Sequence, residues 1–326
     1  MRKKQCFILI FCVVVFIIGA LAFFLLKGND KFFPTEYKEG SGKNYIVYGD
    51  KTYKYNEHLS NYLFMGIDTR EPVETYEGQS DAGQSDAILL VSYNRADKTI
   101  KCLSIPRDTL TNVHIISVDG VEVGTTKVQI TTQYAYGDGK YKSCELMKQT
   151  VSETLYGIPI QGYCSINMDA IPIAVEQIGE VEVVVPNKSL ELVDSIYKEG
   201  STVSITKDNA ETFVRYRDIN QAFSAMDRLE RQKVFSKAFA EKARERADQD
   251  TKFVTNMYES LEPYMVTTIE NSIFAKLAEA GDNFSGEIQD IPGEKVDGMD
   301  FDEYHINETQ LYELILEMFY EEVQGE

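Results

Sequence analysis

The order of hydrophobic and polar residues predicts several short buried strands in the first half of the chain. Mainly apolar runs at residues 59–67, 87–93 and 98–105 are bounded by polar residues, which is typical of strands in the core of a sheet. Two further runs, at 111–118 and 121–126, are separated by an Asp-Gly pair and predict a hairpin. This part of the chain is therefore expected to form much of a sheet.

Helices are predicted in the rest of the chain, where apolar residues recur at steps of three and four, at residues 143–155, 169–178, 225–247, 269–280 and 308–322. Two short strands, at 162–167 and 181–185, lie among them. Asp169 is placed to cap the second helix. Asp208 and Glu211 have the spacing of a capping box that opens a further helix carrying Arg215 and Arg217. Strands that alternate with helices, interrupted by one hairpin, predict an α/β/α sandwich with a central mixed sheet.

The helix predicted at 225–247 has a buried face of mixed character. Its apolar stripe consists of Phe235, Ala238, Phe239 and Ala243. The same steps, taken towards the start of the helix, reach Arg228, Arg231 and Gln232. Charged groups on a buried face need partners, because burying an unpaired charge is costly. The alternative is that the start of this helix protrudes into solvent.

The N-terminus carries an unbroken apolar run at residues 6–26, preceded by Arg2, Lys3 and Lys4. At about 1.5 Å per residue this run spans a hydrocarbon core of about 30 Å, so it predicts a transmembrane helix. The basic residues predict a cytoplasmic N-terminus and an external remainder. A cleaved signal peptide is the alternative.

With this anchor, the chain is expected to divide into three parts. Residues 1–27 are expected to be a cytoplasmic tail and membrane anchor, and residues 28–57 a juxtamembrane segment with a small hairpin. Residues 58–326 are expected to form one extracellular domain.

Composition restricts the possible functions. The chain has 52 acidic and 33 basic residues, a formal charge of −19, so nucleic acid is not an expected partner. Outside the apolar run lie Cys102, Cys144 and Cys164, an odd number without metal-type spacing, and we expect them to be core residues. The three histidines are scattered and indicate neither a zinc site nor a Ser–His–Asp triad.

Charged residues lie next to three of the predicted strands. Asp68 follows the first, Asp86 precedes the second, and Arg107 and Asp108 follow the third after Pro106, which cannot donate to a sheet ladder. Ligands of open α/β sheets bind at such strand ends, and the planar fork of arginine suits phosphate or carboxylate. The alternative is a surface salt bridge.

More arginines occur late in the chain, at positions 215, 217, 228 and 231. Several arginines can hold a pyrophosphate, and two carboxylates can hold Mg²⁺ together with phosphate oxygens. The chain has no glycine-rich phosphate loop, so a P-loop NTPase is not expected.

Seven segments that extend through most of residues 58–260 can be compared with known families. They are MGIDTR (65–70), SDAILL (85–90), SIPRDT (104–109), TKVQITTQYAYGDG (126–139), YGIPIQGYCSINMDAIPIAVEQIGEVEVVVP (156–186), FVRYRD (213–218) and RLERQ (228–232). In this order and spacing, behind a signal anchor, the chain resembles the LytR–CpsA–Psr family of cell-envelope proteins.

The resemblance implies a membrane-anchored, Mg²⁺-dependent phosphotransferase on the outer side of the cytoplasmic membrane of a Gram-positive bacterium. Such an enzyme moves a glycopolymer (teichoic acid, capsule or another wall glycan) from a polyprenyl-pyrophosphate carrier to a peptidoglycan hydroxyl. The polyprenyl tail is expected in an apolar groove lined partly by the helices between residues 143 and 178.

The resemblance also implies roles for individual residues. Asp68 and Asp86 correspond to the family's Mg²⁺-associated carboxylates, and with Arg107 and Arg228 they form the expected catalytic set. The residues expected to bind the pyrophosphate are Arg70, Arg107, Arg215, Arg217, Arg228, Arg231 and Gln232.

The chain departs from the family pattern in two places. Gln84 stands where an arginine often precedes the Ser-Asp pair, and Ser224-Ala225 stand where Gly-Asp is frequent. These departures keep two alternatives open. One is a non-catalytic polyprenyl-pyrophosphate binder that regulates the envelope. The other is a lipid pyrophosphatase that uses water as the acceptor.

Overall fold

The computed structural model describes residues 45–70, 72–73, 82–117, 119–216, 224–250, 252–281, 288–297 and 302–323. The apolar run at 6–26 and Arg217 lie outside these residues, so the membrane helix stays a prediction. In the described part of the chain, no helix combines the length and the apolar character needed to cross a bilayer.

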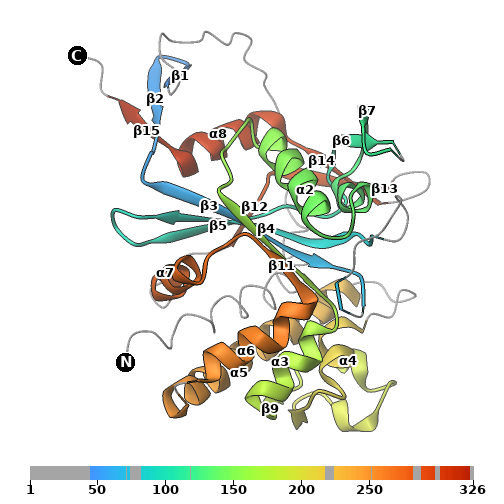
Figure 1. Cartoon of the computed structure of the whole chain (residues 1–326). Helices are drawn as coiled ribbons and strands as arrows, with labels where there is room; N and C mark the ends of the chain where they lie inside the picture. The colour runs from blue at the N-terminus through green and yellow to red at the C-terminus, as the bar shows by residue number, and fades with distance from the viewer. Residues whose placement is uncertain are drawn as a thin grey trace.

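A six-stranded mixed sheet forms the centre of the molecule (Figure 1), as the sequence predicts. Its strands, in spatial order, are β11 (Met265–Thr267), β8 (Gly162–Asn167), β3 (Leu59–Ile67), β4 (Ser85–Asn94), β5 (Ile100–Ser104) and β12 (Ile288–Asp290). The pairs β3–β8 and β5–β12 are parallel, whereas β4 is antiparallel to both of its neighbours. The sequence did not predict β11 and β12, which are three residues long.

Strand β3 is buried at all nine positions, because the sheet is covered on both faces. Tyr62 and Phe64 belong to one hydrophobic core, while Leu63 and Met65, which point the other way, belong to a second core. The helices of the first core are α3 (Ala170–Ile178), α4 (Ala210–Arg215), α5 (Ser224–Gln249), α6 (Phe253–Leu261) and α7 (Asn271–Gly281). Those of the second are α2 (Tyr141–Thr154) and α8 (Glu308–Phe319).

This division corrects the expected lining of the apolar groove, while the groove itself stays a prediction. Helices α2 and α3 contribute to different cores on opposite faces of the sheet. They therefore cannot line one groove together. Their adjacency in sequence is misleading, because β8 lies between them and carries the chain across the sheet.

Smaller elements surround the sheet. The predicted hairpin is confirmed as β6 (Leu110–Ile116) and β7 (Glu122–Gln129), followed by the 3-10 helix η2 (Ile130–Tyr136). The remaining elements are the pairs β9 (Val181–Val184) with β10 (Thr202–Ile205) and β13 (Gly293–Asp297) with β14 (Asp302–Ile306), and the 3-10 turns η3 (Lys188–Leu190), η4 (Ser195–Tyr197) and η5 (Glu262–Tyr264).

Both ends of the described chain meet in a three-stranded sheet. The predicted hairpin of β1 (Tyr45–Tyr48) and β2 (Lys51–Tyr55) is present, and β15 (Tyr320–Val323) adds a third strand beside β2. The helix predicted at 308–322 therefore ends at Phe319, and its last residues form β15. The boundary expected between the juxtamembrane segment (28–57) and the domain (58–326) would separate β1 and β2 from β15.

Candidate active site

Strand direction explains why distant residues meet. Strands β3, β5, β8 and β12 run the same way, so their carboxyl ends lie at one edge of the sheet, where the antiparallel β4 begins. Asp68 follows β3, Asp86 is the second residue of β4, and Arg107 lies just beyond β5. The fold thus places three predicted site residues at the same sheet edge.

Arg107 is the most connected of these residues. Its guanidinium forms an ion pair with Asp86, and its Nη2 donates to Oε1 of Gln84 at 3.2 Å. Its Nε lies 3.5 Å from Oδ1 of Asp108. The side chains of Arg107 and Asp86 remain 37% and 35% exposed, so a ligand can reach both. The salt bridge considered from the sequence exists, and it lies at the strand ends where ligands bind.

Gln84 connects Arg107 with Asp68. The backbone N–H of Gln84 donates to Oδ1 of Asp68 at 2.5 Å, and the N–H of Asp68 donates to the carbonyl of Gln84 at 3.0 Å. The sequence marks Gln84 only as a departure from the family pattern. Its contacts show that it orients a carboxylate and a guanidinium at once, which no periodicity or motif signals.

Asp86 lies in the field of several charged groups. Burial raises the pKa of the Asp86 carboxyl, while the positive charge of Arg107 opposes the shift. Asp68 raises this pKa further, and Arg215 and Arg228 lower it. Four other predicted site residues therefore act on the Asp86 carboxylate, and each comes from a separate stretch of the sequence.

Arg231 and Gln232 have a different role from the one expected, because both are fully buried. Nε of Arg231 donates to the carbonyl of Phe213 at 2.7 Å, and its other nitrogens donate to the carbonyl of Tyr216 and the hydroxyl of Ser189. Burial lowers the pKa of Arg231 to about 10. The expectation that these polar groups need partners is confirmed, and their assignment to pyrophosphate is corrected.

The partners of Arg231 and Gln232 explain the correction. Nε2 of Gln232 donates to the carbonyl of Val214 at 2.8 Å. Together the two side chains bond three carbonyls at the end of α4, where a helix leaves carbonyls without internal partners. The last residue of α4 is Arg215, so these two residues hold the segment that presents it.

Arg70 is bound to carboxylates at the surface. Its guanidinium contacts Asp169 at 3.0 Å and both carboxylate oxygens of Glu211, and Glu211 also accepts from Arg215 at 2.7 Å. Asp169 occupies the N-cap position of α3, as predicted, but its side chain makes no capping hydrogen bond and contacts Arg70. The predicted capping box is wrong, because α4 begins after Asn209 and Glu211 binds Arg70 and Arg215.

The carboxylates fit a magnesium ion in number and kind. Mg²⁺ takes oxygen ligands and is commonly held by one or two carboxylates together with substrate phosphates. Asp68 and Asp86 provide two such groups at one edge. Across the described ranges, no cluster of three or more metal-type side chains occurs, so a cage built from protein alone is not formed there.

The three cysteines of the described chain are buried and free, as predicted. Burial raises the pKa of Cys102, Cys144 and Cys164 to about 12 in each case, so these thiols are poor nucleophiles. The site chemistry therefore does not involve them.

Comparison with known proteins identifies relatives over most of the chain. The model of the LytR_cpsA_psr family matches residues 23–320. The polyisoprenyl-teichoic acid–peptidoglycan teichoic acid transferase TagU of Halalkalibacterium halodurans is 34% identical over 157 residues, which are 48% of this chain and 44% of the relative. The corresponding transferase TagV of Bacillus subtilis is 32% identical over 124 residues, 38% of this chain and 27% of the relative. The chain thus matches less than half the length of these curated relatives.

Solved structures share the fold. The crystal structure of B. subtilis TagV has a TM-score of 0.55 at 22% identity and covers 80% of this chain and 96% of that chain. The protein gbs0355 of Streptococcus agalactiae has a TM-score of 0.58 at 19% identity, with 81% and 90% covered. The structure of TagT bound to LI-WTA has a TM-score of 0.53 at 22% identity, with 80% and 90% covered.

Proposed function

Because the chain belongs to the LytR_cpsA_psr family, we propose that it is a phosphotransferase that moves a cell-wall glycopolymer from a polyprenyl-pyrophosphate carrier to peptidoglycan. The names of the teichoic acid transferases among its relatives support this reaction class. Teichoic acid is the first candidate for the transferred glycopolymer, and capsular polysaccharide is the second. The observation that carries the proposal is the ion pair of Arg107 with Asp86 at the carboxyl ends of the strands, joined through Gln84 to Asp68. Arg215 and Arg228 add positive charge to the field of Asp86.

The proposed reaction is a displacement at phosphorus. The hydroxyl oxygen of the peptidoglycan sugar forms a bond to the phosphorus that carries the glycan, the bond to the bridging oxygen breaks, and polyprenyl phosphate leaves. The hydroxyl proton passes to water. Phosphoryl transfer depends mainly on positioning and charge neutralisation. Arg107 and Arg215, both about one-third exposed, are placed to bind the phosphate oxygens.

Asp68 and Asp86 are the proposed Mg²⁺ ligands. When bound there, Mg²⁺ would neutralise charge that develops on the pyrophosphate oxygens. Arg107 already pairs with Asp86 and so sets the orientation of that carboxylate. Arg70 is joined to the proposed site through Glu211, which accepts hydrogen bonds from both Arg70 and Arg215.

The proposal includes a location. The apolar run at 6–26, with basic residues before it, supports a single-pass anchor in the cell membrane of a Gram-positive bacterium, with the folded part outside. The substrate carrier is a lipid, so an anchored enzyme would share a membrane with it.

The decisive experiment replaces Arg107 by alanine in the full-length protein purified in detergent. With a synthetic polyprenyl-pyrophosphate glycan and peptidoglycan as substrates, Arg107→Ala should lower the transfer rate at least about 100-fold, because it removes a preorganised cation at the phosphate. Arg95→Ala is the matched control, since Arg95 lies beyond the opposite end of β4 and bonds only the carbonyls of Glu57 and His58 among the contacts described. Normal transfer by Arg107→Ala would disprove the site assignment.

The same assay separates the other candidate functions. The transferase is supported if glycan becomes attached to peptidoglycan in the presence of Mg²⁺ and if EDTA prevents this attachment. Cleavage of the lipid pyrophosphate without attached glycan identifies a pyrophosphatase, and binding without cleavage identifies a regulator.

A further inference from the structure

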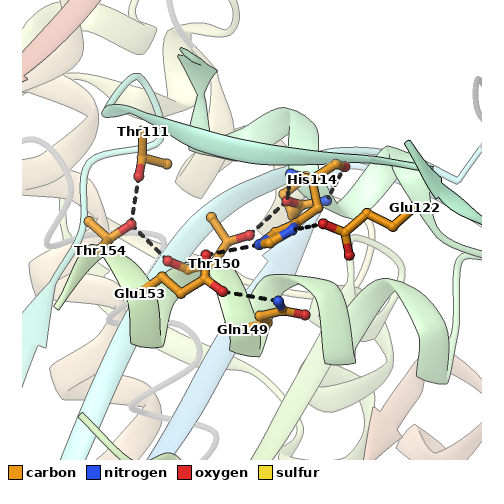
Figure 2. Close-up of polar contacts among 8 residues, drawn as sticks. Thr111, His114, Glu122, Gln149, Thr150, Glu153 and Thr154 are labelled. Atoms are coloured by element: carbon orange, nitrogen blue, oxygen red, sulfur yellow. Dashed lines mark hydrogen bonds and ion pairs between the residues drawn. The ribbon is translucent and has the colours of Figure 1, made fainter. Parts of the chain in front are cut away.

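A buried histidine that belongs to none of the candidate active-site groups lies between two carboxylates (Figure 2). His114 belongs to β6, and its side chain is 5% exposed. Its Nδ1 is 2.8 Å from Oε1 of Glu122 on β7, and its Nε2 is 2.9 Å from Oε2 of Glu153 on α2. One ring therefore joins both strands of the hairpin to the helix below.

The geometry identifies the protonation state that this arrangement needs. A neutral imidazole has one N–H, whereas an imidazolium donates from both nitrogens. Both ring nitrogens face a carboxylate oxygen, and with both carboxylates ionised only the imidazolium satisfies both contacts. In the neutral form, a ring nitrogen lone pair would face the oxygen of Glu122 or Glu153.

Neutral hydrogen bonds hold the surroundings in place. Gln133 of η2 accepts from the N–H of His114 at 2.7 Å and donates to its carbonyl at 3.1 Å, and Thr150 of α2 donates to Gln133. Among the described residues, the charged groups that face the ring are Glu122 from β7 and Glu153 from α2, and η2 contributes the uncharged Gln133. Among these described groups, the protonated ring of His114 is therefore the positive charge that the two glutamates share.

The hairpin that His114 fixes is directly connected to Arg107. Strand β6 begins at Leu110, three residues beyond Arg107. Where β7 returns, Gln129 donates to the carboxylate of Asp108 at 3.2 Å, and the N–H of Thr131 donates to the carbonyl of Arg107 at 3.1 Å. Loosening of the hairpin would therefore release contacts on both sides of Arg107.

We propose that protonated His114 is a positioning residue, a proton-dependent clamp that fixes the β6–β7 hairpin on α2 and thereby supports the Arg107–Asp108 turn. The clamp follows from His114, Glu122 and Glu153, and its link to the turn follows from the contacts of Gln129 and Thr131. Neither depends on which reaction the protein catalyses.

The direction of the pH effect can be worked out. Burial by itself lowers the pKa of His114, but the hydrogen bonds to Glu122 and Glu153 outweigh it, and the pKa is raised above its ordinary value. A raised histidine pKa means that the stabilisation is fully present below the pKa of the unfolded chain, about 6.5, and is lost as pH rises through the folded pKa. The hairpin should therefore loosen on the alkaline side.

Hydrogen exchange of the full-length protein in detergent, followed by mass spectrometry at about pH 6 and about pH 8.5, tests the clamp. After correction for intrinsic exchange, peptides from 110–136 should exchange several-fold faster at the higher pH, while peptides from β3 should not change. In His114→Gln, exchange of 110–136 should be fast at both values. Unchanged protection in the wild type, or the same pH response in His114→Gln, would overturn the proposal.

Two further variants keep the test decisive. His305→Gln is the matched control, because His305 pairs with Glu303 at 2.6 Å on the surface, and its pH response should equal that of the wild type. If His305→Gln abolished the response, His114 would not be its source. Should His114→Gln fail to fold, Glu153→Gln weakens one contact, so protection should be lost at a lower pH, and an unchanged midpoint would contradict the clamp.

Discussion

At the residue scale, the turn before β4 determines how Asp68 is presented. Gly83 has φ +82°, in the left-handed region that favours glycine, and it packs tightly on the Asp68 loop. A Cβ at this position would lie 2.3 Å from Cγ2 of Thr69 and 3.0 Å from Oδ1 of Asp68. Gln84, the next residue, bonds both Asp68 and Arg107. Two uncharged residues therefore align the charged groups of the site.

Gly83→Ala should accordingly damage the site as well as the fold. We expect a loss of about 1–3 kcal/mol in the free energy of unfolding, from backbone strain and the collision with Thr69, and a clear fall in transfer rate as Asp68 moves. Gly49→Ala provides the comparison, because Gly49 has φ +63° but open space around it. It should cost about 1 kcal/mol and leave transfer unchanged. Urea unfolding and the transfer assay measure both, and equal effects of the two variants would contradict this account.

At the element scale, α5 holds the end of α4. Two of the three polar positions at the start of the α5 stripe, Arg231 and Gln232, are buried and donate to carbonyls at the end of α4. Phe235 and Phe239 continue the same face into the core and are fully buried. The helix thus uses one face for two purposes, apolar packing along its length and hydrogen bonding where α4 ends.

Replacement of Arg231 by methionine tests this role. Methionine fills much of the volume but leaves buried carbonyls without donors, at about 1–3 kcal/mol for each group left unsatisfied. We expect the free energy of unfolding to fall by about 3 kcal/mol or more. Lys237→Met on the exposed face of α5 should stay within about 0.5 kcal/mol of the wild type. If urea denaturation gave similar midpoints for both variants, Arg231 would not support the fold in this way.

At the scale of the whole molecule, the two ends of the described chain close on each other. Strand β15 pairs with β2 from Tyr320↔Tyr55 to Val323↔Thr52, and Glu322 forms an ion pair with Lys51 at 2.7 Å. The ion pair is exposed and contributes little. The pairing matters more, since an isolated two-stranded hairpin is marginally stable in water.

Truncation after Phe319 should therefore act locally. Removing β15 is expected to abolish hydrogen-exchange protection in residues 45–55, because β1 and β2 would remain as a hairpin alone. Strands β3 to β5 should keep their protection, and transfer should continue. Retained protection at 45–55 would mean that β15 does not support the hairpin.

The sequence by itself determined the elements whose buried positions follow a regular local pattern. The mainly apolar run at 59–67 and the short strand predicted at 162–167 have the bounds of β3 and β8 in the structure. The helical stripe identified the buried face of α5, and the apolar surroundings of the three cysteines predicted their burial. Such patterns arise from the period of a strand or helix, so they can be read from residues that are close together in the sequence.

Only the tertiary structure decided which groups meet. Strand order and direction bring Asp68, Asp86 and Arg107 to one edge, and they place α2 and α3 on opposite faces. Arg228 and Arg231 lie in one motif, yet Arg228 lies in the field of Asp86 and Arg231 bonds the carbonyls of α4. Arg70 likewise bonds Glu211, far away in sequence. Partners are set by how elements pack, and a linear pattern of residue types holds no record of that packing.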